Sequence, residues 1–253
     1  MENICIVSRD MRFAYAKELF IKNGYGCEIC NPFSVKNADV ILFSPKTELS
    51  NAELEAVFSG VDKDTIVFTG NKKAVEKLHK GRAYDYSESE SFLLDNAYIT
   101  AQCAIKLTFE NTDFCLNGKR ALVLGYGRIG KYLSSMLKCL GADVFVYARR
   151  DETRLSARLE GCKPCSLMEI GEISPCLVYN TVPFKIVEKS VTDTLLHRAL
   201  IIELASNPGG FFDENVAVKA AGLPGKMMPR SAGKAIYDYV SSTLSKIRGE
   251  KSL

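Results

Sequence analysis

The stretch ALVLGYGRIG, residues 121–130, constrains the fold of this chain more than any other feature. An apolar run ends in three glycines spaced G-x-G-x-x-G, and the helical pattern KYLSSMLKCLG follows. In such a strand–turn–helix, the first glycine permits a tight turn, the second lets a phosphate approach the backbone, and the third lets the helix pack closely. The helix N-terminus also favours an anion. The motif therefore predicts dinucleotide binding by Gly125, Tyr126, Gly127, Arg128, Ile129 and Gly130. The alternative is an ordinary glycine turn without a ligand.

The next predicted strand ends in VYARRDE, residues 146–152. At this point, roughly 20 residues beyond the glycines, an NAD site usually holds a carboxylate that binds the ribose 2′-hydroxyl. Arginine instead binds phosphate oxygens bidentately and stacks on aromatic rings such as adenine. The sequence therefore predicts NADP as the cofactor, with Arg149 and Arg150 on its 2′-phosphate. The alternative is that both arginines are merely solvated at a strand end.

Short β-branched runs alternate with helical patterns along the whole chain, which is typical of βαβ units and parallel sheets. Strands are predicted at residues 3–8, 27–30, 39–43, 65–69, 82–86, 121–124, 143–147, 177–181 and 200–204. Helices are predicted at residues 11–23, 48–58, 72–79, 90–114 and 231–247, with others between the later strands.

These elements predict an α/β fold of two doubly wound parallel-sheet domains with a cleft between them. Residues 1–95 form a substrate-side domain, and residues 96–230 form a Rossmann-type NADP-binding domain. The C-terminal helix, within residues 231–253, packs back on the first domain. Ligands bind outside the carboxyl ends of parallel strands, so the turns after two further strands face the nicotinamide. The residues of these turns are Asn180, Thr181, Val182, Pro183, Leu204 and Ala205.

Composition excludes several classes of function. A net charge of +3, from 33 basic and 30 acidic residues, is too small to indicate nucleic-acid binding. No apolar run approaches the roughly 18 residues of a membrane span. The N-terminal MENICIVSRD lacks a basic leader and a cleavage-type site, which predicts a strand and a cytoplasmic protein.

The nine cysteines are scattered through predicted strands and helices, which favours free thiols that pack as small hydrophobic groups. Two pairs have the local spacing of zinc ligands, Cys27 with Cys30 and Cys162 with Cys165. The pairs are far apart in sequence, and positions three apart on a strand point to opposite faces. No metal site is therefore predicted.

Several motifs occur together in a particular order. They are SRDMRFAYAKELF from residue 8, NAYITAQCAI from residue 96, LVLGYGRIG, YARR, NTVP from residue 180, LIIELASNPGG from residue 200, GLPGK from residue 222 and SAG from residue 231. In this combination they resemble the A-subunit family of dipicolinate synthase over nearly the whole chain. More distantly, the second domain resembles the cofactor domains of 2-hydroxyacid dehydrogenases and adenosylhomocysteinases.

The resemblance implies an NADP-dependent oxidation of dihydrodipicolinate to dipicolinate, the calcium chelator made during sporulation. It also implies a flavoprotein-like B subunit as partner and a small dicarboxylate as substrate; a homo-oligomer is a further possibility. Such a site must hold two carboxylates and present one ring carbon to the nicotinamide. The residues with suitable side chains are Thr100, Gln102, Ser206, Lys226 and Arg230.

Four of these residues have an expected role and an alternative. Lys226 and Arg230 bind carboxylates, as do Arg9 and Arg12 from the first domain, or they are surface cations. Thr100 and Ser206 donate hydrogen bonds, or they cap helices. The two histidines are predicted to be non-catalytic, since His79 closes a surface helix and His197 precedes a strand on its far side.

Two departures from the family pattern leave other functions open. Gln102 stands where the family pattern has an acidic residue, and the segment 211–221 is short. The alternatives are an NADP-dependent dehydrogenase of another small carboxylic acid, or a non-catalytic dinucleotide-binding component of a complex.

Overall fold

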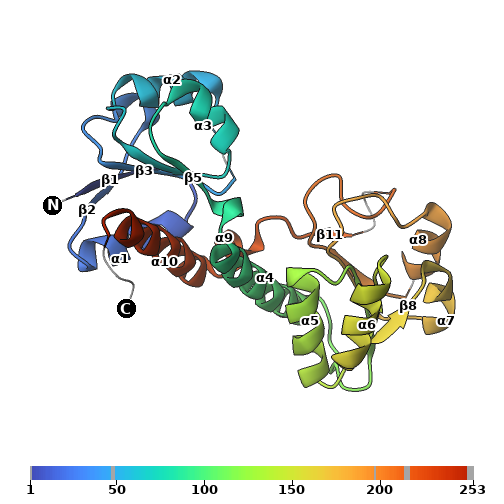
Figure 1. Cartoon of the computed structure of the whole chain (residues 1–253). Coiled ribbons are helices and arrows are strands. Elements are labelled where there is room, and N and C mark those ends of the chain that lie inside the picture. The colour runs from blue at the N-terminus through green and yellow to red at the C-terminus, as the bar shows by residue number, and fades with distance from the viewer. Residues whose placement is uncertain (1, 47–48, 197, 214–216, 250–253) are drawn as a thin grey trace. The chain divides into compact units, whose positions relative to one another are not determined.

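The computed structural model describes residues 2–46, 49–196, 198–213 and 217–249. The chain divides into unit 1, Met1–Asn96 with Pro224–Leu253, and unit 2, Ala97–Leu223 (Figure 1). It passes from one unit to the other within α4 (Glu90–Glu110) and again at the start of α9 (Leu223–Met227).

Unit 1 is built on a five-stranded parallel sheet in the order β2-β1-β3-β4-β5. Its strands are β1 (Asn3–Val7), β2 (Gly26–Ile29), β3 (Val40–Phe43), β4 (Ile66–Thr69) and β5 (Ala83–Asp85). Helices α1 (Arg12–Lys22) and α10 (Pro229–Ile247) cover one face, and α2 (Asn51–Ser59) and α3 (Lys72–Leu78) cover the other (Figure 1). The strand order reverses between β1 and β3, where the chain leaves β1 toward β2 on one side and later returns to β3 on the other.

The strands of unit 1 are buried on both faces because helices cover each side of a parallel sheet. One core cluster packs strand residues such as Val7, Ile41 and Phe43 against helix residues such as Leu54 and Val57. Helix α2 begins at a capping box in which the Ser50 and Glu53 side chains each bind the other's backbone N–H.

Helix α10 packs along α1, which returns the end of the chain to unit 1. Residues 224–230 also belong to unit 1, whereas the sequence placed the boundary after residue 230. The reason is a close approach that glycine allows: a Cβ added at Gly225 would lie 3.2 Å from the Asp10 carboxylate and 3.3 Å from Arg12 Nε.

Unit 2 holds a six-stranded parallel sheet in the order β11-β10-β9-β6-β7-β8. Its strands are β6 (Arg120–Leu124), β7 (Asp143–Tyr147), β8 (Lys163–Cys165), β9 (Leu177–Asn180), β10 (Leu200–Glu203) and β11 (Val218–Lys219). Counted within the unit, this is the strand order 3-2-1-4-5-6 of the Rossmann fold.

Helices also pack against the second sheet (Figure 1). Those of unit 2 are α5 (Arg128–Cys139), α6 (Asp151–Leu159), α7 (Ile170–Ile173) and α8 (Lys189–Leu196). A core cluster joins Leu122 and Leu124 of β6 to Ile170 of α7 and Leu195 of α8. The part of α4 in unit 2 is fixed by a buried hydrogen bond of 2.7 Å between the hydroxyls of Thr108 and Tyr179.

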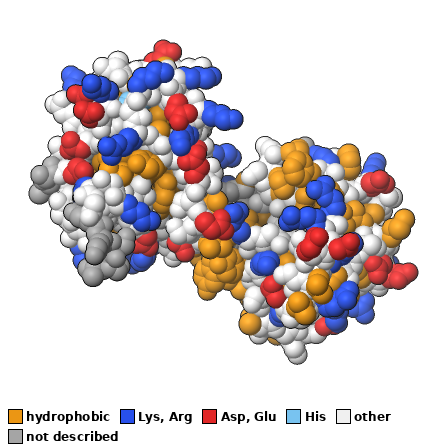
Figure 2. Space-filling model, in the orientation of Figure 1, with side chains coloured by type: hydrophobic (Ala, Val, Ile, Leu, Met, Phe, Trp, Pro, Cys, Tyr) orange, Lys and Arg blue, Asp and Glu red, His pale blue; other side chains and the backbone are white. Residues whose placement is uncertain are grey.

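The predicted α/β fold of two parallel-sheet domains is confirmed. Two strands were not predicted, β8 and β11, and both lie at sheet edges. Pro164 lies in β8, and proline argues against a strand assignment from sequence. It is tolerated here because β8 is an edge strand. On the face shown in Figure 2, basic and acidic side chains are interspersed on each unit. Among the described residues, no helix combines the length and hydropathy that a bilayer crossing requires.

Candidate dinucleotide site

The glycine turn of unit 2 leads from β6 into α5, and each glycine occupies a distinct environment. Gly125 has φ +96°, and an added Cβ would meet Thr181 Oγ1 at 2.5 Å. A Cβ at Gly130 would lie 2.3 Å from the Gly125 carbonyl oxygen, which only glycine avoids. A Cβ at Gly127 would have nothing within 4 Å, so this position opens to space that a phosphate can enter.

The N-terminus of α5 is suited to an anion. Gly127 is its N-cap residue and no side chain caps the helix. The first N–H groups of a helix lack intrahelical partners, and the helix dipole favours negative charge at this end. The open backbone at Gly127 and the uncapped helix therefore form a place for a pyrophosphate.

Arg149 and Arg150 follow β7, the strand next to β6, and both side chains are exposed. Within the described ranges, neither guanidinium forms a hydrogen bond or an ion pair. The neighbouring carboxylate of Asp151 is engaged by Arg154. The loop after β7 thus presents two available cations where an NAD site holds an acid.

Tyr126 turns its side chain into unit 2 and contacts α6. Its hydroxyl donates to Glu160 Oε2 at 2.8 Å, and it lies 3.8 Å from Cys162 Sγ. This hydrogen bond, with help from Ser156 and Lys131, lowers the pKa of the Glu160 carboxyl. Burial raises the pKa of the Tyr126 hydroxyl. Tyr126 therefore anchors the glycine turn to α6, and Glu160 is a supporting residue that sequence reasoning missed.

The turns after β9 and β10 are joined by a polar network that was also missed. Asn180 is fully buried and donates from Nδ2 to Glu203 Oε1 at 2.6 Å. The same carboxylate accepts from the backbone N–H of Ala205 at 3.0 Å and of Gly210 at 2.9 Å. An acid at the end of the apolar run LIIE was the available signal, because a carboxylate in such a position needs partners.

The predicted cofactor residues all lie at the carboxyl ends of four adjacent strands of unit 2. From one side to the other these strands are β10, β9, β6 and β7. Thr181 holds the middle pair together, since its N–H and its hydroxyl each donate to the Leu124 carbonyl at 2.9 Å. Leu204 N–H donates to the Asn180 carbonyl at 2.9 Å and joins the next pair. The structure therefore brings the predicted cofactor residues together at the carboxyl ends of these strands. They are Gly125 to Gly130, Arg149, Arg150, Asn180, Thr181, Val182, Pro183, Leu204 and Ala205.

The residues with suggested catalytic roles are divided between the units. Thr100 and Gln102 lie on the part of α4 in unit 2, with Thr100 buried and Gln102 Nε2 3.4 Å from the Tyr98 hydroxyl. Ser206 is exposed after β10. Lys226 and Arg230 belong to unit 1 and are exposed, and the Arg230 guanidinium lies 5.6 Å from the centre of the Tyr15 ring.

Arg12 was expected to be available to a substrate carboxylate, but its guanidinium is engaged within unit 1. Its Nε and Nη2 bind Asp10 Oδ2 at 2.9 and 2.5 Å. Burial favours the neutral Asp10 carboxyl, yet these bonds outweigh it and lower its pKa. Arg9 remains exposed, and its one ion-pair contact among the described residues is a long one of 3.7 Å to Glu53.

The histidine and cysteine predictions need correction. His79 is buried rather than on the surface: its ring stacks on Phe58 and its Nε2 lies 2.8 Å from the Thr65 carbonyl oxygen. His197 lies outside the described residues. Cys5 and Cys30, expected to be free, form a disulfide, because β1 and β2 are adjacent and bring their Cα atoms to 6.0 Å.

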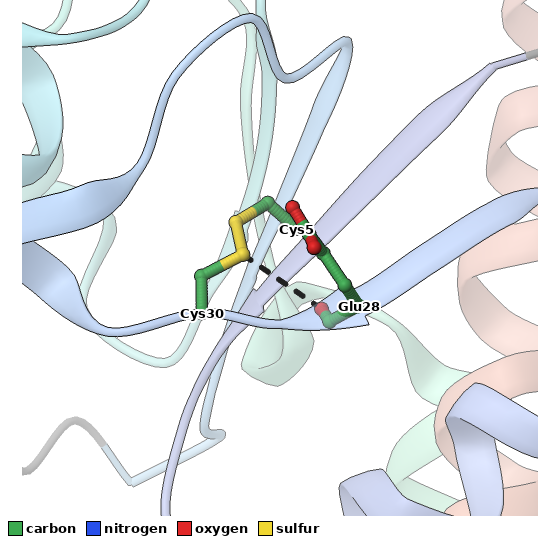
Figure 3. Close-up of side chains that lie close together, drawn as sticks. All are labelled: Cys5, Glu28 and Cys30. Atoms are coloured by element: carbon green, nitrogen blue, oxygen red, sulfur yellow. Dashed lines mark hydrogen bonds between the residues drawn. A yellow bond between two sulfur atoms is a disulfide. The ribbon is translucent and has the colours of Figure 1, made fainter.

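Glu28 lies beside this disulfide (Figure 3). Among the described residues, Cys5, Glu28 and Cys30 are the group whose possible metal-ligand atoms lie within 4.8 Å of one another. Both sulfurs are bonded to each other, so they are not available as thiolates, and a structural zinc site needs four ligands. Cys162 and Cys165 are separately buried in unit 2, and burial raises the pKa of the Cys165 thiol to about 12.

Comparison with known proteins identifies unit 2. Residues 96–230, more than half of the chain, match the family described as S-adenosyl-L-homocysteine hydrolase, NAD binding domain. The chain belongs to this family. Unit 2 is thus a nicotinamide-dinucleotide-binding domain of Rossmann type, in agreement with its strand order and its glycine turn.

Individual relatives extend the similarity to the rest of the chain. The dipicolinate synthase A subunit of Bacillus subtilis (strain 168) is 28% identical over 228 residues, which cover 85% of this chain and 73% of that protein. S-inosyl-L-homocysteine hydrolase of Methanocaldococcus jannaschii is 27% identical over 69% of this chain but only 40% of that protein. The crystal structure of the Bacillus subtilis dipicolinate synthase A chain has the same fold, with a TM-score of 0.80 at 22% identity over 99% of this chain and 98% of that one. The resemblance to the dipicolinate synthase A subunits is confirmed.

Proposed function

We propose that this chain uses NADP to oxidise dihydrodipicolinate to dipicolinate. The observation that carries the choice of NADP is the exposed pair Arg149 and Arg150, which has no acidic partner among the described residues, at the position where NAD sites hold a carboxylate. The choice of substrate rests on the similarity to the dipicolinate synthase A subunit over most of the chain.

The residues at the edge of unit 2 fit a dinucleotide. Gly127 leaves room for a pyrophosphate against the N-terminus of α5, and Arg149 with Arg150 fits a 2′-phosphate. The turns after β9 and β10, fixed by Asn180 and Glu203, flank the nicotinamide end. When bound, the dinucleotide supplies a hydride acceptor; the protein supplies orientation and exclusion of water.

The reaction removes a hydride and a proton from a dihydropyridine ring, and aromatisation drives it. Lys226 and Arg230 are the cations proposed for the two carboxylates, since Arg12 is engaged by Asp10. Thr100 and Ser206 are the proposed hydrogen-bond donors. Gln102 is not a base, so the proton passes to a carboxylate, a lysine or water.

One observation favours a second candidate function. The amide of Gln102 lies near the Tyr98 hydroxyl, where the family pattern suggested a carboxylate. A dehydrogenase of another small carboxylic acid has no need of that group. A non-catalytic dinucleotide-binding component of a complex is the third alternative, and turnover separates it from the others.

A partner and a compartment follow from the same proposal. The name of the Bacillus subtilis relative implies a further component in that enzyme, so we propose a flavoprotein-like B subunit as partner here. The reaction would take place in the cytoplasm, where free NADP is present. Turnover measured with and without the B subunit decides whether activity requires it.

The test follows absorbance of reduced nicotinamide. Purified protein is mixed with freshly generated dihydrodipicolinate and either NADP or NAD. Turnover with NADP is expected to fall by about 100-fold in Arg149→Asp, equivalent to roughly 2.7 kcal/mol, while turnover with NAD is retained. Arg158→Asp, an exposed arginine in the last turn of α6, is the charge-matched control and should leave the preference unchanged.

Two results would contradict the proposal. An equal loss of turnover with NADP and with NAD in Arg149→Asp would contradict the assignment of NADP. Measurable NADP binding without turnover, even when the B subunit is added, would exclude the enzyme and favour a non-catalytic role.

A further inference from the structure

Unit 1 has a cavity at the place where its topology expects a ligand. In doubly wound sheets, ligands bind outside the carboxyl ends of the strands, where the strand order reverses. In unit 1 this point lies between β1 and β3. A cavity of about 280 Å³ lies there, lined by residues from the ends of β1, β2 and β3 and the segments that follow them.

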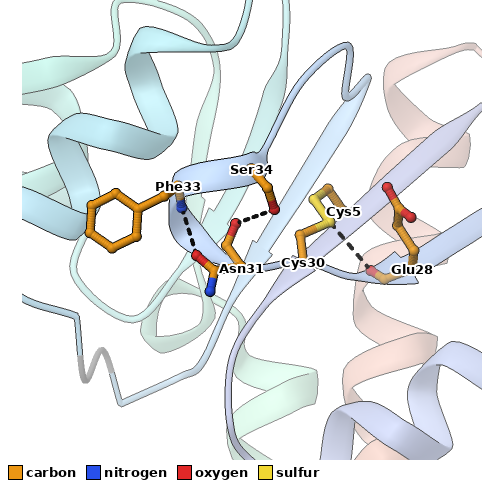
Figure 4. Close-up of a disulfide and its surroundings, with 6 residues drawn as sticks. All are labelled: Cys5, Glu28, Cys30, Asn31, Phe33 and Ser34. Carbon is orange, nitrogen blue, oxygen red and sulfur yellow. Dashed lines mark hydrogen bonds between the residues drawn. A yellow bond between two sulfur atoms is a disulfide. The ribbon is translucent and has the colours of Figure 1, made fainter.

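The walls of the cavity combine apolar and hydrogen-bonding surfaces. Ile29 is exposed and Leu49 is half-buried, and both provide apolar contact, whereas Val7 and Phe43 are core residues that close the cavity from below. Cys30, joined to Cys5 on β1, forms part of the wall and is followed directly by Asn31 (Figure 4). A ligand that fits must therefore have an apolar body as well as polar groups.

Two serine hydroxyls of the lining are arranged to donate hydrogen bonds. Ser8 Oγ accepts from the Asp10 backbone N–H at 3.1 Å, and Ser44 Oγ accepts from the Lys46 backbone N–H at 3.2 Å. Since each oxygen already accepts a backbone hydrogen bond, the hydroxyl hydrogen is the group left for a ligand. Ligand oxygens that accept hydrogen bonds are therefore favoured.

The charge of the lining is positive. Arg9 is the charged residue among the described residues that line the cavity, and no carboxylate belongs to that lining. Its nearest anion is Glu53 at 3.7 Å, and the Glu53 carboxylate is bound by the backbone N–H and the hydroxyl of Ser50. Arg9 is thus available to an anion, while a metal ion finds no carboxylate ligand.

A phosphate at the adjacent helix N-terminus is disfavoured. The Asp10 carboxylate already occupies that position, where Oδ1 accepts the Arg12 backbone N–H at 2.9 Å. A second anion against α1 would meet this negative charge. The volume is also too small for a dinucleotide, since typical sites of drug-sized ligands begin at roughly 300 Å³.

From the position, lining and charge of this cavity, we infer that unit 1 binds a small organic carboxylate with a flat apolar body. Arg9 pairs with the carboxylate, and the hydroxyls of Ser8 and Ser44 donate to its oxygens. The apolar body packs against Ile29 and Leu49. All the lining residues belong to unit 1, and only the choice of dipicolinate as first probe rests on the proposed function.

Calorimetric titration of the full chain tests this inference. The probes are dipicolinate, benzoate, pyridine and inorganic phosphate, each with and without NADPH. Dipicolinate is expected to bind, and its affinity should fall at least tenfold in Arg9→Gln and in Ser44→Ala. Arg82→Gln removes an exposed arginine just before β5 and is the matched control. NADPH affinity should be unchanged in all three variants, which shows that each is folded.

The outcomes separate this inference from the proposed function. Dipicolinate affinity that is unchanged in both cavity variants overturns the inference, whatever the turnover. Pyridine or phosphate binding as tightly as the carboxylates would overturn the carboxylate assignment. Carboxylate binding that depends on Arg9, without turnover of dihydrodipicolinate, would support the cavity and count against the proposed function.

Discussion

The turn after β1 in unit 1 and the turn after β6 in unit 2 occupy the same topological position. Each follows the first strand of a parallel sheet, lies at the point where strand order reverses, and leads into a helix. Their chemistry differs. The turn of unit 2 is made of glycines and opens to space at Gly127, whereas the turn of unit 1 places the Asp10 carboxylate at the start of α1.

In parallel sheets topology sets where ligands bind, and the two turns differ in the groups that they offer to a ligand there. An uncapped helix with a glycine N-cap admits a phosphate. A helix whose first N–H already donates to a carboxylate, as that of Arg12 does to Asp10, disfavours one. Unit 1 therefore leaves only Arg9 and the serine hydroxyls at its reversal point, among the described residues, which suits a smaller anion.

The largest expected difference between the units concerns stability. Only unit 1 contains the Cys5–Cys30 disulfide, among the described residues, and the two cysteines are 25 residues apart in sequence. Cross-linking such a loop stabilises a fold by about 3 kcal/mol. Cys30→Ser should therefore lower the free energy of unfolding of unit 1 by about that amount, as measured by hydrogen exchange of the β1 and β2 amides in unreduced protein.

Cys27→Ser is the matched control, since Cys27 is a free, partly buried cysteine on β2. Its effect on the same amides should be small. Exchange in unit 2 should not change in either variant. An equal loss of protection in both units would show that the disulfide is not a feature of unit 1 alone.

The second prediction concerns a substitution that fills the open space at Gly127. Because an added Cβ meets nothing there and φ is −84°, Gly127→Ala should fold normally. The methyl group would occupy the space of the pyrophosphate, so NADPH affinity should fall by about 100-fold, or roughly 2.7 kcal/mol. Fluorescence titration with NADPH measures the loss, and thermal unfolding measures stability.

Gly130→Ala is the informative counterpart, because its Cβ would lie 2.3 Å from the Gly125 carbonyl oxygen. This variant should lose stability as well as affinity. Wild-type affinity in Gly127→Ala would show that the dinucleotide does not approach the backbone at this turn.

The sequence predicts features whose contacts are local in sequence, and it misses features that depend on contacts between distant segments. The glycine turn and the two arginines after β7 are short motifs whose geometry is local, so the sequence predicts their placement on one sheet edge. The disulfide depends on β1 lying beside β2, in a register that pairs Cys5 with Glu28. Nothing in the spacing of the cysteines indicates that register.

The supporting contacts were missed for the same reason. Glu160 binds the Tyr126 hydroxyl of the glycine turn, 34 residues away in sequence. Glu203 binds the Asn180 side chain, 23 residues away. Unit 2 ends at Leu223 because Gly225 approaches Asp10, from the other end of the chain, whereas the family match runs to residue 230. Periodicity identifies elements, but it does not show which side chains from distant elements meet.

The third prediction concerns acid sensitivity at the turn of unit 1. Asp10 has a lowered pKa in the folded state, so its contribution to stability is present above the unfolded pKa, about 3.9, and is lost as pH falls through the folded value. Asp10→Asn should lower the free energy of unfolding by about 1.5 kcal/mol at pH 7, because Arg12 loses a charged acceptor.

The difference between wild type and Asp10→Asn should shrink as pH falls below about 4, where the wild-type carboxyl becomes protonated. Urea unfolding at several pH values measures this. Asp193→Asn, which changes an exposed carboxyl on α8 of unit 2, is a control for general charge effects. A difference that stays constant down to about pH 2 would mean that the charge of Asp10 does not stabilise α1.

The smallest effect is expected from buried tyrosine hydroxyls, which again differ between the units. Tyr179 in unit 2 shares a 2.7 Å hydrogen bond with Thr108, while the hydroxyl of Tyr86 in unit 1 has no hydrogen-bond partner among the described residues. A buried hydroxyl without a partner costs free energy, so Tyr86→Phe should leave stability unchanged or raise it by up to about 1 kcal/mol. Tyr179→Phe should lower stability by about 1 kcal/mol, because Thr108 Oγ1 loses the hydrogen bond that it accepts and keeps only the one that it donates to the Ala104 carbonyl. Urea unfolding of both variants measures the two effects. Equal losses of stability would mean that the Tyr86 hydroxyl has a partner in solution. Asp10 and Arg12, whose charges act on this hydroxyl, would then be the first groups to examine.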